Sequence, residues 1–132
     1  MRKEEYKQKN DDFLKEISLQ EGIHSLPCGI YYRVIKEGEG EISPVLRSIV
    51  SVHYRGTLID GKEFDNSYTR NCPEAFRLSD VIDGWQIALQ KMHAGDKWII
   101  YIPYTMGYSK RACGPIPAYS TLIFEVELLS IG

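Results

Sequence analysis

Residues Ser79–Met92 read SDVIDGWQIALQKM, and the rest of the chain is organised around them. Apolar side chains recur there at steps of three and four residues, at Ile82, Trp85, Leu89 and Met92. This spacing predicts a short helix with one wide apolar face. Ser79 or Asp80 can cap its start, and Gly95 suits a left-handed turn after its end. Because the flanking segments have strand patterns, we expect the helix to fill a sheet that curls around it.

The clearest strand is Val50–Leu58, where apolar and polar side chains alternate between two faces. Asp60–Gly61 predicts a tight two-residue hairpin that leads back into Lys62–Asp65. Gly22–Gly29 contains Pro27 and is expected to form a loop. The other expected strands are Ile30–Ile35, Ala75–Leu78, Lys97–Ile102 and Leu122–Leu128. The sequence therefore predicts an α+β fold in which an antiparallel half-barrel of five to six strands wraps one short central helix.

Charged residues dominate residues 2–20, and the apolar positions Tyr6, Phe13, Leu14 and Ile17 interrupt them. This pattern predicts an extra N-terminal helix with one narrow apolar stripe. We expect residues 1–21 to be a helical appendage and residues 22–132 to form the main domain. The stripe can pack on its own domain or pair with a second copy, so the chain is expected to be a monomer or a dimer through residues 2–20.

Composition limits the classes of partner. The chain is 43% hydrophobic and 26% charged, as is usual for a globular protein, and its net charge of −2 provides no field for nucleic acid. No apolar run approaches the roughly 20 residues of a membrane span. The charged start Met1–Tyr6 does not resemble a signal peptide, so a cytoplasmic location is expected for the sequence as given. A periplasmic or surface location is expected instead if a leader has been removed.

The usual catalytic and metal-binding motifs are absent from the sequence. The three cysteines, Cys28, Cys72 and Cys113, are odd in number and far apart, and we expect buried or half-exposed free thiols. No cofactor and no metal ion is expected.

Aromatic side chains instead lie on the predicted inner faces of the elements, at Tyr54, Phe64, Phe76, Trp85, Tyr108 and Phe124. Tyr108 belongs to the long segment 103–120, which is too rich in aromatic side chains to be a solvated tail. Such a set predicts a shallow apolar cavity that binds a small apolar group.

Five segments together resemble the FKBP-type peptidyl-prolyl isomerases: Val52–Leu58, Asp60–Asp65, Val81–Trp85, Met92–Gly95 and Ile116–Leu128. They occur in the family's order from about residue 27 to the C-terminus. The N-terminal helix followed by Leu26–Ile30 is similar to the bacterial, macrophage infectivity potentiator branch. The resemblance implies a proline-ring pocket between sheet and helix, isomerase activity on Xaa-Pro bonds in peptides or unfolded proteins, chaperone-like assistance to folding, and macrolide inhibitors as ligands. A non-catalytic module that binds proline peptides is the alternative.

The resemblance also implies roles for individual residues. The catalytic set would be Tyr54, Phe64, Asp65, Trp85, Tyr108 and Phe124, and the substrate-binding set would be Phe76, Val81, Ile82 and Ile116. Trp85 would lie under the proline ring, while the Ile82 amide and the Tyr108 hydroxyl would bind the peptide backbone. Glu74 and Ser109 depart from the family's usual aromatic residue and glycine, which affects the rim and the affinity for macrolides more than the pocket floor.

Overall fold

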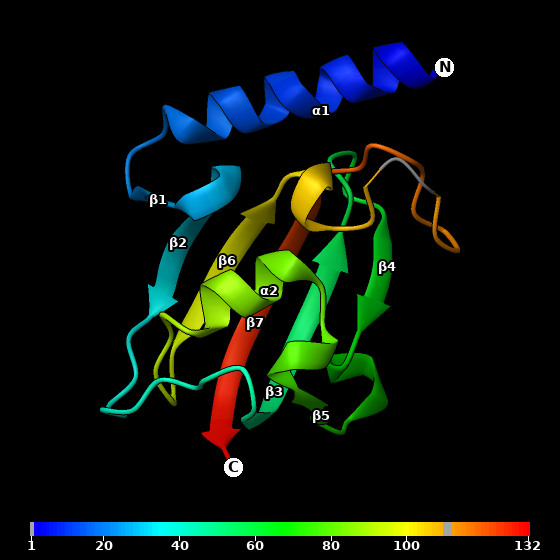
Figure 1. The fold of residues 1–132 in the computed structure, drawn as a ribbon. Helices are drawn as coiled ribbons and strands as arrows, with labels where there is room; N and C mark the ends of the chain where they lie inside the picture. The colour runs from blue at the N-terminus through cyan, green and yellow to red at the C-terminus, as the bar shows by residue number, and fades with distance from the viewer. Residues whose placement is uncertain (1, 110–111) are drawn as a thin grey trace.

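A computed structural model describes residues 2–109 and 112–132. Within them the chain forms two α-helices and one antiparallel sheet of seven strands (Figure 1). The helices are α1 (Lys3–Ser18) and α2 (Asp83–Leu89). The strands are β1 (Ile23–Leu26), β2 (Ile30–Lys36), β3 (Ile49–Thr57), β4 (Glu63–Asn66), β5 (Glu74–Arg77), β6 (Lys97–Ile102) and β7 (Leu122–Ile131). Their order in the sheet is β1-β2-β6-β7-β3-β4, and β5 also pairs with β3.

The predicted α+β class is confirmed, because the sheet curls around α2, which lies across its concave face (Figure 1). Trp85, Ala88 and Leu89 turn inward from α2 and are buried. Gly84 allows the helix to approach β6 closely, since a Cβ atom there would lie 2.6 Å from the Ile102 side chain. The central core is therefore apolar packing between one short helix and the inner faces of the strands.

The boundaries of α2 differ from the prediction. The helix begins at Asp83 with Ile82 as its N-cap, while Leu78–Asp80 forms a separate 3₁₀ turn. Neither Ser79 nor Asp80 caps α2, because the extended backbone of Val81 (φ −98°, ψ 172°) separates them from the helix. Side-chain periodicity predicted which residues are buried, but the backbone break was not visible in it.

Gly22–Gly29, predicted to be a loop, contains strand β1, which pairs with β2. The turn between them passes through Cys28 and Gly29, which have positive φ angles of 66° and 77°. Four residues are too few for a period of two to stand out from a turn-rich sequence. The sheet consequently has one strand more than the predicted upper number.

The hairpin after β3 has a three-residue loop rather than the predicted two-residue one. Leu58 N–H donates to the Lys62 carbonyl (2.9 Å), and Gly61 N–H donates to the Leu58 carbonyl (3.0 Å). Gly61 has the positive φ angle (87°) that the prediction required. A glycine in this position ends the common three-residue hairpin, so the same residue serves a longer turn.

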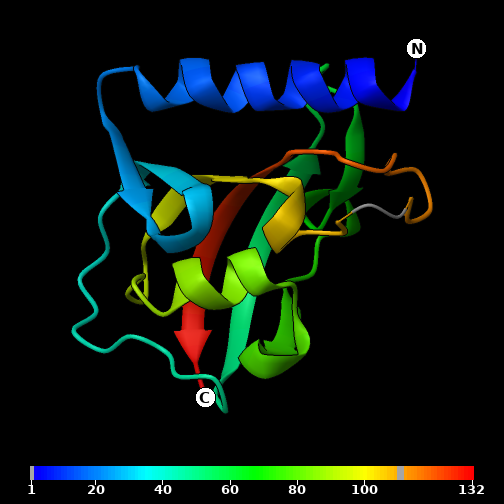
Figure 2. The ribbon, with the colours of Figure 1, turned by 45° about the horizontal axis from the view of Figure 1, so that its top comes forward.

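Helix α1 runs across one end of the sheet and packs on its own domain (Figure 2). Ile17 is 6% exposed, Asn10 is fully buried, and the rings of Phe13 and Tyr101 lie 6.3 Å apart. Of the two predicted uses of the apolar stripe, packing on its own domain is therefore present. No helix among the described residues is long and apolar enough to cross a membrane.

Candidate functional site

A cavity of about 520 Å³ opens between the concave face of the sheet, α2 and the described parts, 103–109 and 112–121, of the loop between β6 and β7. All ten predicted site residues line it: Tyr54, Phe64, Asp65, Phe76, Val81, Ile82, Trp85, Tyr108, Ile116 and Phe124. Strands β3, β4, β5 and β7, the start of α2 and the loop each supply some of them. Residues that are up to 70 positions apart in the sequence, from 54 to 124, thus meet at one site.

Trp85 forms the floor of this cavity, and the rings around it stand on edge. Its ring meets those of Tyr54 and Phe124 at 5.2 Å and 86° in each case, and that of Phe76 at 5.8 Å and 89°. The ring of Phe64 meets that of Phe124 at 5.5 Å and 88°. Edge-to-face contacts of this kind stabilise each pair and hold the walls perpendicular to the floor. The result is a rigid apolar cup.

Gly56 on β3 makes this arrangement possible, although the sequence analysis did not name it as a site residue. A Cβ atom at this position would lie 2.6 Å from Cζ of Phe64 and 3.0 Å from the Phe124 ring. Any side chain would push both walls away from the strand. The available signal was a glycine in the otherwise regular alternation of the β3 segment.

One side of the cup is polar. The Tyr54 hydroxyl donates a hydrogen bond to one oxygen of Asp65, and Arg70 Nη1 donates to the other at 2.7 Å. Arg70 Nη2 also lies 3.4 Å from the Tyr54 hydroxyl, and Arg70 Nε donates to Glu74 at 3.1 Å. Arg70 was missed because it lies in an irregular polar loop, where no periodicity indicates what a side chain contacts.

The electrostatics of this polar side keep each group in one protonation state near neutral pH. Burial, followed by the hydrogen bond to Asp65, raises the pKa of Tyr54 to about 12. Burial alone would raise the pKa of Asp65, but the hydrogen bonds from Tyr54 and Arg70 and the guanidinium charge lower it on balance. Burial also raises the pKa of Tyr108. Near pH 7 the site therefore contains two neutral phenols and an ionised carboxylate.

The loop closes the remaining side. Cys113 and Ile116 exchange backbone hydrogen bonds of 2.8 and 2.9 Å, which makes a narrow turn at the rim. Four further residues line the cavity and were not predicted as site residues: Asp80, Cys113, Gly114 and Pro115. All three cysteines are free and exposed, which corrects the expectation of buried or half-exposed thiols. Among residues 2–109 and 112–132, no group of three or more His, Cys, Asp or Glu side chains could hold a metal ion.

Comparison with known proteins supports one family throughout. Residues 40–129 match the family described as FKBP-type peptidyl-prolyl cis-trans isomerase. The chain is 47% identical over 120 residues to the FKBP-type 22 kDa peptidyl-prolyl cis-trans isomerase of Escherichia coli, covering 90% of this chain and 58% of that protein. It is 42% identical over 129 residues to the outer membrane protein MIP of Legionella longbeachae, covering 97% of this chain and 55% of the relative.

A solved structure agrees along the whole chain. The crystal structure of a peptidyl-prolyl cis-trans isomerase from Pseudomonas syringae superposes with a TM-score of 0.92 at 34% identity, covering all of this chain and 97% of that one. By contrast, the chain spans little more than half the length of the two curated relatives. The predicted resemblance is confirmed, including its macrophage infectivity potentiator branch, and the chain belongs to the FKBP-type peptidyl-prolyl cis-trans isomerase family.

Proposed function

We propose that this chain is a peptidyl-prolyl cis-trans isomerase that binds the proline ring of an Xaa-Pro bond in the aromatic cup. The observation that carries the proposal is the Trp85 floor with its ring of edge-on aromatic walls. The cup is apolar and matches a small ring in shape. Phe64 and Phe124 act as the walls, and Phe76, Val81 and Ile116 complete the apolar lining.

Rotation about a prolyl bond is slow because amide resonance must be broken, at a cost of about 18–20 kcal/mol. The planar amide is charge-separated and well solvated, whereas the twisted amide is less polar. An apolar cup removes the water that favours the planar form, so the barrier falls without a proton transfer. A 10⁴-fold acceleration needs only about 5.5 kcal/mol.

Polar groups at the edge of the cup orient the peptide. The Ile82 amide and the Tyr108 hydroxyl donate to carbonyl groups of the bound peptide and hold it bent, which adds an orientation term. The hydrogen bonds from Tyr54 and Arg70 hold the Asp65 carboxylate in place. There it lies beside the proline ring of the bound peptide and faces the twisting amide. Macrolide inhibitors of the family compete for the same cup.

The test is an NMR exchange assay on Xaa-Pro peptides, with Phe124→Ala as the critical variant. Loss of one wall should remove at least nine tenths of kcat/KM. The substitution also costs about 3–5 kcal/mol of stability, so circular dichroism must show that the variant is folded. Tyr32→Ala is a matched aromatic truncation outside the cavity, where Tyr32 stacks on Trp98 at 4.0 Å, and it should retain activity.

Two outcomes would contradict the proposal. A folded Phe124→Ala variant with full activity would show that the cup is not the site. Peptide binding without any acceleration of exchange would favour the alternative, a non-catalytic proline-binding or chaperone module.

The pH profile tests the mechanism. Because Tyr54, Asp65 and Tyr108 do not titrate near neutrality, kcat/KM should vary by no more than about twofold between pH 6 and 8.5. Cys113 is the one lining thiol among the described residues, and Cys113→Ser is the control variant for a thiol contribution to the rate. A bell-shaped profile that a His→Gln substitution abolishes would instead indicate general acid–base catalysis.

For the compartment we propose the periplasmic or surface alternative rather than the cytoplasmic one. The support is that the relative from Legionella longbeachae is named as an outer membrane protein. Fractionation of the source cells, followed by immunoblotting, would decide between the two compartments.

A further inference from the structure

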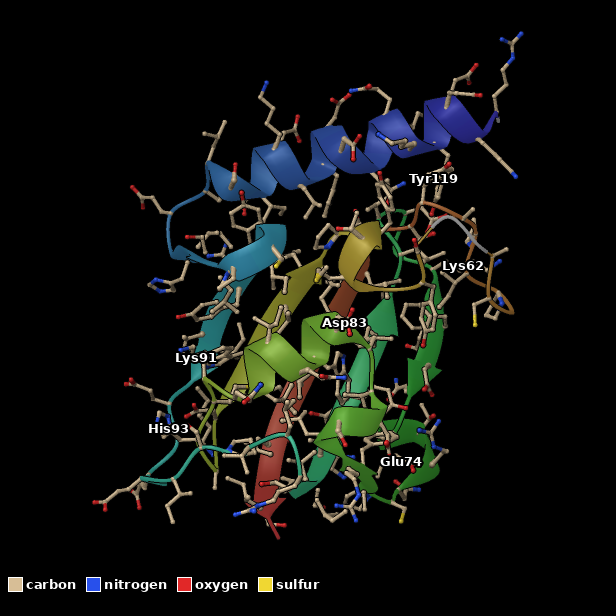
Figure 3. The ribbon with its side chains drawn as sticks, viewed as in Figure 1. Lys62, Glu74, Asp83, Lys91, His93 and Tyr119 are labelled. Carbon is tan, nitrogen blue, oxygen red and sulfur yellow. The ribbon has the colours of Figure 1, made fainter. Side chains whose placement is uncertain are left out.

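Helix α1 contacts both ends of the loop 103–121, which supplies part of the cavity wall. Five lining residues come from this loop, namely Tyr108, Cys113, Gly114, Pro115 and Ile116. The C-terminal part of the loop, drawn in orange, runs beneath α1 before β7 begins (Figure 2). In Figure 3, Tyr119 lies directly under the helix. The helix thus lies against the base of the loop rather than on the cup itself.

Asn10 makes the most specific of these contacts. Its side chain is completely buried, although it lies in the middle of α1, where many of the neighbouring helix residues are charged. Its Oδ1 atom accepts a hydrogen bond of 2.7 Å from Thr121 N–H, across 111 residues of sequence. Its Nδ2 atom donates to the Tyr6 carbonyl at 2.8 Å. A buried amide is tolerated only when it is paired, so this residue fixes where α1 and the loop meet.

A second contact lies one helical turn earlier. The Tyr6 hydroxyl lies 2.8 Å from Ser120 Oγ, which itself donates to the Pro117 carbonyl at 2.7 Å. At the other end of the loop, Lys7 Nζ lies over the ring of Tyr104, 5.6 Å from its centroid. One face of α1 therefore holds both the entry and the exit of the loop.

Hydrogen bonds within the loop connect the segment beneath α1 to the part of the loop that lines the cup. Tyr119 N–H donates to the Ser109 carbonyl at 3.0 Å, and Ser109 N–H donates to the Tyr104 carbonyl at 2.7 Å. The rings of Tyr104 and Tyr119 also meet edge to face at 5.1 Å. Ser109 directly follows Tyr108, so a single hydrogen bond, from Tyr119 N–H to the Ser109 carbonyl, links the segment that Asn10 holds to the neighbour of the site tyrosine.

We propose that Asn10 is a positioning residue for the isomerase site, and that α1 is a brace for the loop that presents Tyr108 and Ile116. This inference rests on the proposed function for its activity readout. It also modifies the expected domain division at residue 21, because it makes the helical segment part of the working site. Floor residues such as Trp85 do not depend on the brace, so the effect should fall mainly on substrate binding.

The variants are Asn10→Leu and Tyr6→Phe. Asn10→Leu keeps the branched shape and the number of heavy atoms and removes both side-chain hydrogen bonds. Tyr6→Phe removes a single oxygen and should fold even if Asn10→Leu does not. For Asn10→Leu we expect kcat/KM to fall three- to tenfold, mostly through KM, and the Thr121 amide to exchange with solvent at least tenfold faster. For Tyr6→Phe, the decrease in the logarithm of kcat/KM should be about half of the decrease for Asn10→Leu.

Two control variants separate positioning from general loss of stability. Lys9→Ala changes an exposed side chain of α1, and Leu128→Ala truncates a fully buried side chain that does not line the cavity, near the end of β7 opposite α1 (Figure 1). Both should keep kcat/KM within twofold of wild type at a temperature where every variant is folded. If Leu128→Ala lowers kcat/KM as much as Asn10→Leu does, the effect is stability alone and the inference is wrong.

The outcomes also separate this inference from the proposed function. Unchanged kcat/KM in both Asn10→Leu and Tyr6→Phe, with faster Thr121 exchange, would overturn the brace while leaving the isomerase intact. If the wild-type chain binds an Xaa-Pro peptide without turning it over, the proposed function fails. The inference then stands or falls on whether the same two variants raise the peptide Kd by the factor expected for KM.

Discussion

The two helices are held in place by different forces. Helix α2 has seven residues, and four of them, Gly84, Trp85, Ala88 and Leu89, are buried in the apolar core. Helix α1 has sixteen residues and buries only Asn10 and Ile17. An isolated helix of seven residues is not stable in water, so α2 depends on its packing. Helix α1 is attached instead by a few half-buried rings and by specific hydrogen bonds.

This difference explains what each helix can do. Apolar packing places α2 firmly enough to form the floor of a cavity, because many contacts must be lost together before it moves. A small number of directional bonds places α1 in one register on the loop, but each bond contributes only about 0.5–1.5 kcal/mol.

The largest effect is expected in the core. Leu89→Ala on α2 should lower the free energy of unfolding by about 2–5 kcal/mol, because Leu89 is completely buried. Phe13→Ala on α1 should cost less than half as much, since Phe13 is only partly buried. Urea unfolding of both variants measures the two values. Equal losses would show that α1 is packed as tightly as α2, and the comparison would fail.

A second substitution tests how closely α2 approaches the sheet. Gly84→Ala should destabilise the protein by about 1–3 kcal/mol, since the added methyl group meets Ile102. This destabilisation is opposite to the effect of helix propensity, which favours alanine over glycine by up to about 1 kcal/mol. Lys9→Ala on the exposed face of α1 should stay within about 0.5 kcal/mol of wild type in the same unfolding experiment. A stabilising Gly84→Ala would mean that the contact with β6 is loose.

The polar wall of the cup should make the stability of the protein depend on pH in the alkaline range. Folding raises the pKa of Tyr54 to about 12, from about 10 in the unfolded chain. As the pH rises, the unfolded state therefore loses this proton first. The contribution of Tyr54 to stability is complete below about pH 10 and is lost between about pH 10 and 12. The Tyr54→Phe variant should show a shallower decline in unfolding free energy over this range. Parallel curves for the two proteins would contradict the assigned environment of Tyr54.

The smallest effect concerns the loop that α1 braces. Ser109 has a positive φ angle of 62°, in the place where the family usually has glycine. Ser109→Gly should raise the free energy of unfolding by up to about 1 kcal/mol, because the strain of a left-handed side chain outweighs the added freedom of the unfolded chain. Ser109→Ala provides the control, as it removes the hydroxyl and keeps the strain. If both variants gain equally, the backbone at this position is not strained.

The sequence alone determined those features that depend on local periodicity and residue type. The apolar spacing of Ser79–Met92 predicted the buried helix, the alternation in Val50–Leu58 predicted the central strand, and the aromatic residues predicted an apolar cup. These predictions succeed because burial selects side chains at the period of the element that carries them. The family resemblance then named ten of the fourteen residues that line the cavity.

The features that depend on contacts between distant residues could be identified from the three-dimensional structure alone. The ion pair of Arg70 with Asp65, the close approach over Gly56 and the bond from Asn10 to Thr121 leave no periodic trace in the sequence. The true start of α2 and the strand β1 depend likewise on backbone angles at Val81 and Cys28. The partner of a single polar side chain depends on three-dimensional geometry and not on a repeating sequence pattern. This is why the apolar cup could be predicted and the brace that holds its rim could not.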